Sequence, residues 1–250
     1  MSDIFWLSDE QFKAIKRYFP SPHGVPRVDD RRVVSGIIHV LKRGLQWRDA
    51  PAIYGPHKTL YTRFRRWSRM GVFDKIFANL VAQDCAHDHL QIDATHLKAH
   101  RTASSLLKGG MPRAIGRTKG GLNSKLHAVC NQDGRPVALH LTAGQVSDYK
   151  GAEALLDRRP KAKALLADRG YDATWFRNAL KSKGIEPCIP AKRNRKTPVK
   201  YDKDIYKKRH KVENMFAKLK DWRRIATRYD RRADIFMAAI TIACIVIWWI

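Results

Sequence analysis

The segment from Tyr206 to Lys220, YKKRHKVENMFAKLK, combines residue types that phosphodiester chemistry uses. If it forms one helix at about 100° per residue, Tyr206, Arg209, Glu213 and Lys220 fall within an arc of roughly 60°. A phenol, a guanidinium, a carboxylate and an amine would then share one face. Such a face suits a metal ion that faces a phosphodiester. A solvated charged helix is the alternative that this spacing leaves open.

Two aspartates could supply further carboxylates beside Glu213. The stretch HLQIDAT predicts a short strand that ends in Asp93, and ALLADRG predicts a strand that ends in Asp168. Three such carboxylates can hold two Mg²⁺ ions about 3.5–4 Å apart, because Mg²⁺ prefers hard oxygen ligands. One ion would activate the attacking water or 3′-hydroxyl, and the other would stabilise the departing 3′-oxygen. The alternative is that each aspartate only caps the turn after its strand.

The other polar residues of the basic segment suit contacts with DNA. Arg209 and Lys220 can pair with phosphates near the scissile bond, and Tyr206 can stack on a flipped base or bond to a phosphate. A structural ion pair between Arg209 and one of the acids is the alternative for that residue.

Further cations lie in basic loops that we expect to follow the DNA backbone. They are Lys119, Lys125, Arg193, Arg195 and Lys196. Each of them alone can equally be a solvated charge. Two spare acids near the predicted site, Asp148 and Asp172, are interpreted as turn or capping residues.

The net charge narrows the class of partner. The 250 residues include 49 Lys and Arg against 23 Asp and Glu, which gives a formal net charge of +26. This excess favours a polyanion, either a nucleic acid or an anionic membrane. Because the charge is spread along the whole chain, we expect a globular nucleic-acid binder and not a core with a basic arm.

Cysteine and histidine spacing argues against other kinds of site. The four cysteines, Cys85, Cys130, Cys188 and Cys244, lie far apart, so neither a structural zinc site nor a disulfide framework is expected. His96 and His100 have the spacing of a zinc-protease motif, but Leu97 stands where that motif needs its glutamate. The amino terminus does not resemble a signal peptide.

An uncharged segment, IFMAAITIACIVIWWI, occupies residues 235–250. Its 16 residues are fewer than the roughly 20 that span a bilayer. We therefore expect a buried terminal helix and no membrane partner, with a tail anchor as the alternative.

Residues 1–85 are expected to form helices. Ser8 and Gln11 suggest a capping box, Asp29 and Asp30 can cap a second helix that stops at Gly44, and Thr59 can cap a third. The third helix carries an apolar stripe of Leu60, Phe64 and Trp67, with Arg63, Arg66 and Arg69 pointing elsewhere. Such a helix suits a helix-turn-helix that lies in the DNA major groove, and a plain bundle with solvated arginines is the alternative.

Residues 86–250 are expected to form an α/β domain. Strand, hairpin, helix, strand, helix, strand and helix follow one another, and Asp133-Gly134 marks the hairpin turn. The order predicts an RNase H-like catalytic domain, a mixed sheet flanked by helices, preceded by the all-α helix-turn-helix-like domain. A long basic helix from about Asp202 and the apolar helix complete the chain.

The sequence resembles bacterial insertion-sequence transposases of the DDE type, in the insertion sequence five family. The carrying segments include DDRRVVSGIIHVLKRGLQWRDAPAIYGPHKTLYTRFRRW, IDATHLKAHRTA, IGRTKGGLNSKLHAV, LADRGYDA and DWRRIATRYDR. The family signature on the last catalytic helix is Tyr, two residues, Arg, three residues, Glu, six residues and Lys. Tyr206, Arg209, Glu213 and Lys220 match it without a departure in spacing.

The resemblance implies a function and a set of ligands. Asp93, Asp168 and Glu213 would be the catalytic acids and the ligands of Mg²⁺, for which Mn²⁺ can substitute. The protein would bind the terminal inverted repeats of its element, cleave the DNA ends and join the 3′-hydroxyl to target DNA. A dimer is expected in the synaptic complex, in the bacterial cytoplasm at the nucleoid.

Two rival functions stay open from the sequence. A protein that binds DNA without catalysis, such as a repressor of its own element, would have the same charge. A membrane-associated protein would use residues 235–250 as an anchor.

Overall fold

The computed structural model describes residues 4–21, 29–84, 87–105 and 113–250. Cys85 and the first part of the glycine- and lysine-rich segment at 108–125 lie outside these ranges. The chain forms two compact units, which are described separately. Unit 1 comprises Met1–Gln83, His100–Pro112 and Leu219–Ile250, and unit 2 comprises Asp84–Ala99 and Arg113–Lys218.

Unit 1 is helical, as expected for its amino-terminal part. Its α-helices are α1 (Asp9–Lys16), α2 (Asp30–Arg43), α3 (His57–Arg69), α4 (Val72–Ala82), α9 (Arg223–Ala226) and α10 (Ala233–Trp248). Short elements complete it: η1 (Trp47–Asp49), η2 (Ala52–Tyr54), η3 (Arg101–Ser104) and the two-residue strand β7 (Thr227–Arg228). The division into domains 1–85 and 86–250 stays a prediction, because α10 belongs to the same compact unit as the amino-terminal helices.

Local capping explains where the first helices begin. Ser8 and Gln11 form the predicted capping box of α1, and Asp29 accepts a hydrogen bond from the N–H of Arg31 at the start of α2. Gly44 ends α2 in the left-handed region, at φ 78°. The cap predicted at Thr59 is wrong: α3 begins at His57, directly after Pro56, whose fixed φ suits a helix start.

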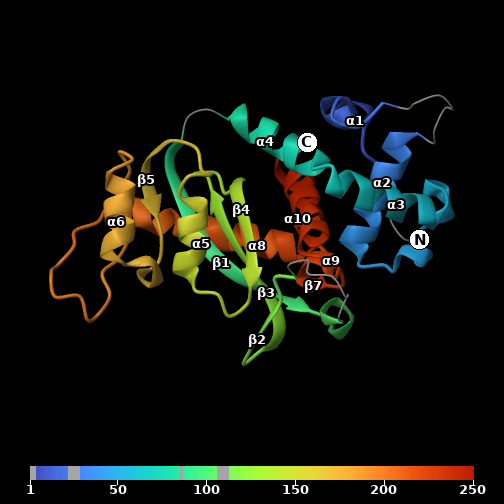
Figure 1. Cartoon of the computed structure of the whole chain (residues 1–250). Coiled ribbons are helices and arrows are strands. Elements are labelled where there is room, and N and C mark those ends of the chain that lie inside the picture. The colour runs from blue at the N-terminus through green and yellow to red at the C-terminus, as the bar shows by residue number, and fades with distance from the viewer. Residues whose placement is uncertain (1–3, 22–28, 85–86, 106–112) are drawn as a thin grey trace. The chain divides into compact units, whose positions relative to one another are not determined.

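The apolar core of unit 1 gathers around α3 and α10. The predicted stripe of Leu60, Phe64 and Trp67 is fully buried. Helix α10 lies against α2, α3 and α4 and buries most of its length, as predicted for the apolar terminal segment (Figure 1). In the described ranges, no helix has both the length and the apolar character that crossing a membrane requires.

Unit 2 is built on a mixed sheet. Its strands are β1 (His87–Ala99), β2 (Gly116–Thr118), β3 (Gly121–Cys130), β4 (Pro136–Ala143), β5 (Ala162–Leu166) and β6 (Glu186–Cys188). They run in the order β2, β3, β1, β5, β6, with β4 also paired to β3. Strand β3 is antiparallel to β1 and β4, whereas β1, β5 and β6 are parallel. The predicted mixed sheet is thus confirmed.

Strand β1 is longer than its sequence suggested. The prediction ended it at Asp93, but the strand continues to Ala99, because β3 pairs with it through Lys98. Asp93 therefore stands in the middle of β1, opposite Ala128. The antiparallel neighbour supplies the hydrogen bonds that hold the polar half of β1 in the sheet.

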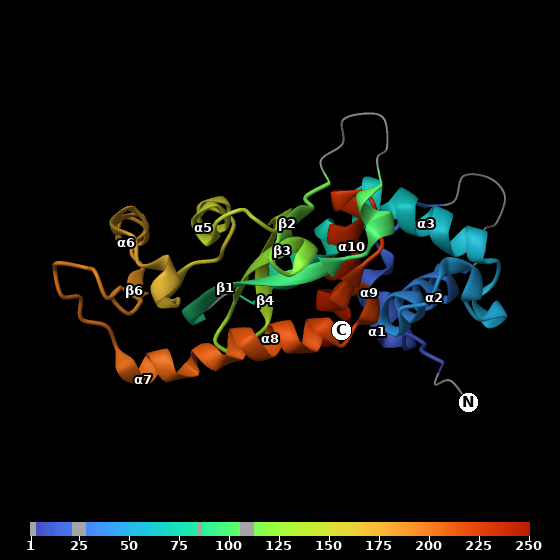
Figure 2. The same cartoon turned by 90° about the horizontal axis from the view of Figure 1, so that it is seen from below.

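Helices cover both faces of the sheet. Figure 2 shows α5 (Asp148–Leu155) and α6 (Thr174–Lys181) on one side of the strands, with α7 (Lys203–Tyr206) and α8 (His210–Lys220) on the other. The single basic helix predicted from Asp202 is interrupted between α7 and α8 by a 3₁₀ turn, η5 (Lys207–Arg209). A 3₁₀ turn advances about 120° per residue, so Tyr206 and Arg209, three residues apart, stay on the same face across it.

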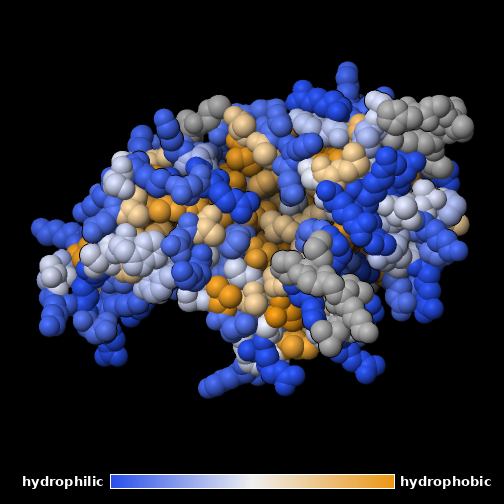
Figure 3. Space-filling view, in the orientation of Figure 1, coloured by the Kyte–Doolittle hydropathy of each residue, from blue (hydrophilic) through white to orange (hydrophobic). Residues whose placement is uncertain are grey.

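Hydrophilic side chains dominate the face seen in Figure 3, including the region of α6 and the basic segment after β6 at its left edge. In that basic segment, residues 191–200, some of the polar groups bond to an acid inside the fold. Asp172 accepts hydrogen bonds from Arg177 Nε at 2.7 Å, Arg195 Nε at 2.8 Å and the N–H of Lys192 at 2.8 Å. These contacts attach the segment to α6.

Asp172 ends the 3₁₀ turn of residues 169–171 through its backbone N–H, as its interpretation as a turn or capping residue expects, and its side chain is in addition a buried ionic centre. Its side chain is 1% exposed. Burial by itself raises the pKa of Asp172, but the bonds from Arg195, Lys192 and Arg177 outweigh it and lower the pKa to about 2. Arg195, which was expected to follow DNA, is committed to this carboxylate.

We predict that Asp172→Asn destabilises the chain by about 3–5 kcal/mol in urea unfolding at neutral pH, because Arg177 would keep a buried charge without its anion. The folded pKa lies below the unfolded one, so the stabilisation is present above about pH 4 and is lost as the pH falls towards 2. The exposed pair of Asp157 with Lys183 offers a control, and Asp157→Asn should change little. Equal losses in both variants would contradict this account.

Candidate active site

The register of β1 and β5 places two of the predicted acids just beyond the end of the parallel ladder between these strands. Gln91 of β1 pairs with Leu166, the last residue of β5, in a parallel ladder. Asp93 comes two residues after Gln91, and Asp168 comes two residues after Leu166. Since side chains alternate between the faces of a strand, Gln91 and Asp93 lie on the same face of β1.

A tight turn holds Asp168 directly after β5. Its Oδ1 accepts a hydrogen bond from the N–H of Gly170 at 2.8 Å and caps the 3₁₀ turn η4 (Arg169–Tyr171). A Cβ on Gly170 would lie 2.8 Å from the same oxygen, so a larger residue there would push the carboxylate aside. Asp168 is thus a capping residue as well as a candidate ligand.

Glu213 is positioned by a contact that the sequence did not reveal. Gln91 is fully buried, and its Oε1 accepts a hydrogen bond from the N–H of Val212 at 3.2 Å. Val212 lies in the first turn of α8, where N–H groups have no partner within the helix. The bond therefore fixes the start of α8 against β1 and places the next residue, Glu213, near Asp93. The sequence signal for this contact is a glutamine that lies two residues before an acid, on the same face of a predicted strand.

Arg209 joins the first and third acids. Its Nη1 lies 3.0 Å from Asp93 Oδ2, and its Nη2 lies 2.9 Å from Glu213 Oε1. The Arg209 and Asp93 side chains are only 16% and 21% exposed, whereas Glu213 is 58% exposed. The ion pair that the sequence left as an alternative for Arg209 is present, and a contact of this residue with DNA stays a prediction.

The electrostatics of Asp93 show that the three acids act on one another. Burial raises the pKa of the Asp93 carboxyl to about 6, and the charges of Asp168 and Glu213 raise it as well. The N–H of Ala94 and the guanidinium of Arg209 lower the pKa without cancelling these effects. Ionisation of Asp93 is therefore unfavourable in this environment, and a nearby cation would make it less so.

The donor chemistry fits a hard divalent cation. Asp93, Asp168 and Glu213 offer carboxylate oxygens, which Mg²⁺ and Mn²⁺ prefer, and the raised pKa of Asp93 shows that positive charge is needed there. Among the described residues, however, no three His, Cys, Asp or Glu side chains are arranged to hold a metal ion. Arg209 stands between two of the carboxylates, and Asp168 bonds to its own turn.

The other residues of the family signature have different surroundings. The ring of Tyr206 packs edge-on against Tyr201, with centroids 5.4 Å apart, and its hydroxyl interacts with Arg209. Lys220 is the exposed last residue of α8 and belongs to unit 1.

The predicted basic loops contain both exposed and committed cations. Lys119, Arg193 and Lys196 are exposed. Lys125 is 9% exposed, and its Nζ donates to the carbonyl of Val146 and pairs with Asp148 at 3.1 Å. This corrects the expectation that Lys125 lies in a loop open to DNA: it is a strand residue with a structural ion pair, and Asp148 is its partner.

The arginines of α3 divide in the same way. Arg66 and Arg69 are exposed, as a role in DNA binding requires. Arg63 instead pairs with Asp30 of α2 at 3.1 Å, and its guanidinium lies over the ring of Trp67. Arg63 thus holds two helices together, which corrects its interpretation as a cation directed towards DNA.

Unit 1 also has a cavity of about 440 Å³ that combines aromatic rings and arginines. The guanidinium of Arg65 lies 5.4 Å from the ring centroid of Tyr61, and Arg224 lies over both Trp47 and Tyr229. Tyr61 and Tyr229 are 38% and 40% exposed. Exposed rings beside arginines are typical of surfaces on which nucleic-acid bases stack. These residues come from distant segments of the chain, so no local sequence pattern marks them as one site.

Comparison with known proteins supports the same interpretation. A family model described as "Putative transposase of IS4/5 family" matches residues 7–77, and one described as "Transposase DDE domain" matches residues 84–248. The protein described as "Putative transposase for insertion sequence element IS402" of Burkholderia cepacia is 34% identical over 181 residues, which cover 62% of this chain and 83% of that protein.

Two further similarities extend this result. The protein described as "Putative transposase for insertion sequence element IS6501" of Brucella ovis is 34% identical over 129 residues, 51% of this chain and 98% of that protein. The solved structure of the piggyBac transposase synaptic complex with hairpin DNA is 10% identical, with a TM-score of 0.50 over 97% of this chain and 72% of that one. At this identity the similarity concerns the fold alone, which is RNase H-like.

We predict that Gln91→Met loosens the start of α8. The amide of Val212 would lose its acceptor, so its hydrogen exchange should accelerate and unfolding should require about 1 kcal/mol less. Exchange measured by mass spectrometry checks the first effect, and urea titration checks the second. Gln145→Met, at an exposed position of the same unit, is the control. Unchanged exchange at Val212 would contradict the positioning role of Gln91.

The raised pKa of Asp93 predicts a pH-dependent stability. Between about pH 4 and 6 the folded chain keeps a proton that the unfolded chain releases, so the stabilisation is lost as the pH rises through about 6. Asp93→Asn should therefore be more stable than the natural chain near pH 7.5, by on the order of 2 kcal/mol, and equally stable near pH 3.5. Urea unfolding with a chelator present measures both. A variant that is less stable at the higher pH would contradict this.

Proposed function

The chain belongs to the DDE transposases of the insertion sequence 4/5 family, and from that premise we propose that it cleaves the ends of its own element and joins them to target DNA. The observation that carries this proposal is the Arg209-centred cluster, in which one guanidinium bonds Asp93 and Glu213 while Asp168 acts on the pKa of Asp93. These are the three acids that the family pattern assigns to catalysis.

In this proposal Asp93, Asp168 and Glu213 hold Mg²⁺, for which Mn²⁺ can substitute. The bound ions would supply Lewis acidity at the scissile phosphate and an acidified water or 3′-hydroxyl as the nucleophile. The Asp93 side chain is only 21% exposed, which limits competition from water for its oxygens. Arg209 neutralises two of the acids in the metal-free chain, and its guanidinium is the group closest to them that could pair with a DNA phosphate.

We propose that both units contact double-stranded DNA. In unit 2 the exposed cations Lys119, Arg193 and Lys196 would follow the backbone. In unit 1, Arg66 and Arg69 of α3 would contact the terminal inverted repeats, which assigns end recognition to residues 1–85 and catalysis to residues 86–250. Synapsis of two ends predicts a dimer on the DNA, since each end needs its own set of acids.

The decisive experiment uses the DNA that flanks the coding region. Short inverted repeats there would be the substrate, and the purified chain should nick them at the element ends when Mg²⁺ or Mn²⁺ is added. Asp93→Ala, Asp168→Ala and Glu213→Ala should each abolish cleavage, because each removes a proposed metal ligand. DNA binding, measured by fluorescence anisotropy without metal, should survive in all three.

Glu153→Gln is the matched control, since it removes an exposed carboxylate from α5 of the same unit. It should cleave like the natural chain. Full cleavage by Asp93→Ala would contradict the proposed mechanism. Sequence-specific binding of the repeats without metal-dependent nicking would favour the alternative of a repressor that lacks catalysis.

A further inference from the structure

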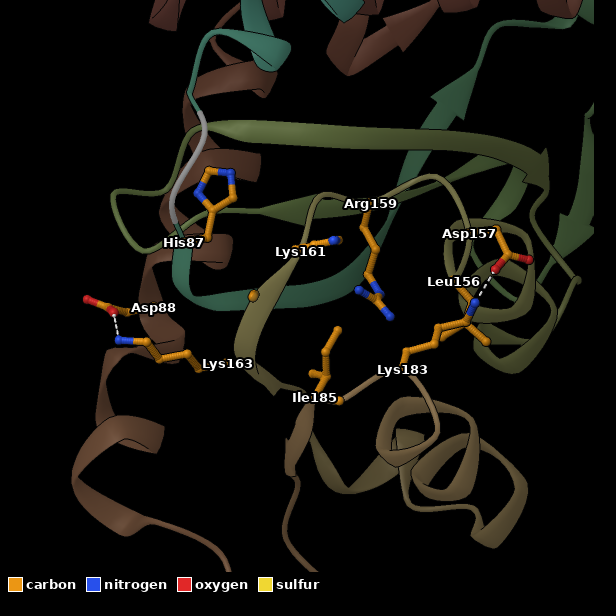
Figure 4. Close-up of a pocket in the computed structure, with 11 residues that line it drawn as sticks. His87, Asp88, Leu156, Asp157, Arg159, Lys161, Lys163, Lys183 and Ile185 are labelled. Carbon is orange, nitrogen blue, oxygen red and sulfur yellow. Dashed lines mark hydrogen bonds and ion pairs between the residues drawn. The ribbon is translucent and has the colours of Figure 1, made fainter.

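Unit 2 contains a charged cavity at the amino-terminal ends of β1 and β5. Its volume is about 670 Å³. The walls come from the start of β1, from the segment after α5, from the start of β5 and from the turn after α6 (Figure 4). The residues used below are His87, Asp88, Asp157, Arg159, Lys161, Lys163 and Lys183.

This cavity lies far from the candidate catalytic acids. His87 pairs with Ala162 at the beginning of the parallel ladder of β1 and β5, whereas Asp93 and Asp168 come after its end. His87 and Asp93 are six residues apart on one strand, or about 20 Å at the usual rise of a strand. A group bound in the cavity could not be the phosphate that reacts at the acids.

The two carboxylates of the cavity are neutralised by lysines. Lys163 Nζ lies 2.8 Å from Asp88 Oδ1, and Lys183 Nζ lies 2.6 Å from Asp157 Oδ1, as the dashed lines in Figure 4 show. The hydrogen bond from each lysine lowers the pKa of its aspartate, so both carboxylates stay ionised and paired at neutral pH. Neither presents a free negative charge to a ligand.

The remaining cations of the cavity lack an acid within bonding distance. Arg159 has two buried nitrogens, Nε and Nη2, without a hydrogen-bond partner in the described part of the chain, and Nη1 donates only to the carbonyl of Pro160 at 3.3 Å. Burial lowers the pKa of Arg159, and the charge of Asp157 raises it without cancelling the effect of burial. Lys161 is exposed and makes no hydrogen bond or ion pair with a described residue. Figure 4 shows both side chains extending into the cavity.

We propose that this cavity binds a phosphate group, with Arg159 and Lys161 as its ligands. A guanidinium can bond two oxygens of one phosphate through paired N–H groups, and an ammonium can contact a third oxygen as a point charge. Because Nε and Nη2 of Arg159 are buried, its guanidinium must rotate towards the cavity to make this pairing. Binding would satisfy two buried donors whose present lack of partners costs stability. The phosphate could belong to a DNA backbone or to a free phosphate compound. Only the first source rests on the proposed function.

Lysine labelling tests the site directly. The natural chain is treated with an amine-reactive reagent, and modification of Lys161 is followed by mass spectrometry with no addition, with inorganic phosphate, and with a short DNA duplex. No metal is present, so cleavage plays no part. Phosphate is expected to slow the modification of Lys161 and to leave Lys13, an exposed lysine of α1, unchanged.

Two neighbouring arginines give a matched pair of variants. Arg159→Gln should lose the protection of Lys161, whereas Arg158→Gln, which removes the same charge from an exposed side chain one residue away, should retain it. Arg159→Lys keeps the charge without the paired N–H groups, so weaker protection is expected. Circular dichroism of each variant shows whether it is folded, and Arg159→Lys takes the place of Arg159→Gln if the latter does not fold.

The outcomes separate the sources of phosphate. Protection by both phosphate and duplex, lost in Arg159→Gln, supports a DNA backbone site. Protection by phosphate alone supports a site for a free phosphate compound. No protection of Lys161 in the natural chain, or undiminished protection in the Arg159 variants, overturns the proposal. Cleavage at element ends is measured separately, so its failure would leave the phosphate result standing.

Discussion

Like charges that meet at a partly buried site require a cation, and this constraint shapes unit 2. Burial raises the pKa of Asp93, and the charges of Asp168 and Glu213 add to this effect. Arg209 meets this need by bonding to two of the acids. The 3₁₀ turn before α8 carries Arg209, and the buried Gln91 fixes the start of that helix. The position of α8 therefore determines that Arg209 lies beside the acids.

The cations that give the chain its large positive charge fall into two groups. Some cations bind acids inside the fold: Arg63 joins two helices, Lys125 joins β3 to the start of α5, and Arg177 with Arg195 attaches the basic segment after β6 to α6. Removing one partner of such a pair is costly, since the other keeps its charge away from water. The remaining cations stay exposed, where they repel one another and attract a polyanion.

Local signals explain which elements could be predicted. Ser8 bonds with Gln11, Asp29 accepts from the N–H of Arg31, and Gly44 ends α2, so these ends of the helices followed from signals within a few residues. Thr59 has the right chemistry for a cap, but Pro56 already begins the helix. The end of β1 could not be predicted from its own residues, because the partner strand β3 extends it past Asp93. The interruption at Lys207–Arg209 carries no proline or glycine that would have marked it.

The sequence by itself determined the family, the three candidate acids and the demand for a polyanionic partner, because residue type, spacing and net charge are properties of the chain alone. Only the tertiary structure decided which charges are available. The register of β1 with β5 places Asp93 and Asp168 just beyond the end of their parallel ladder, and Arg209 reaches Asp93 across 116 residues of sequence. Whether a cation binds an acid inside the fold or stays free for a phosphate depends on such distant pairings, and composition does not encode them.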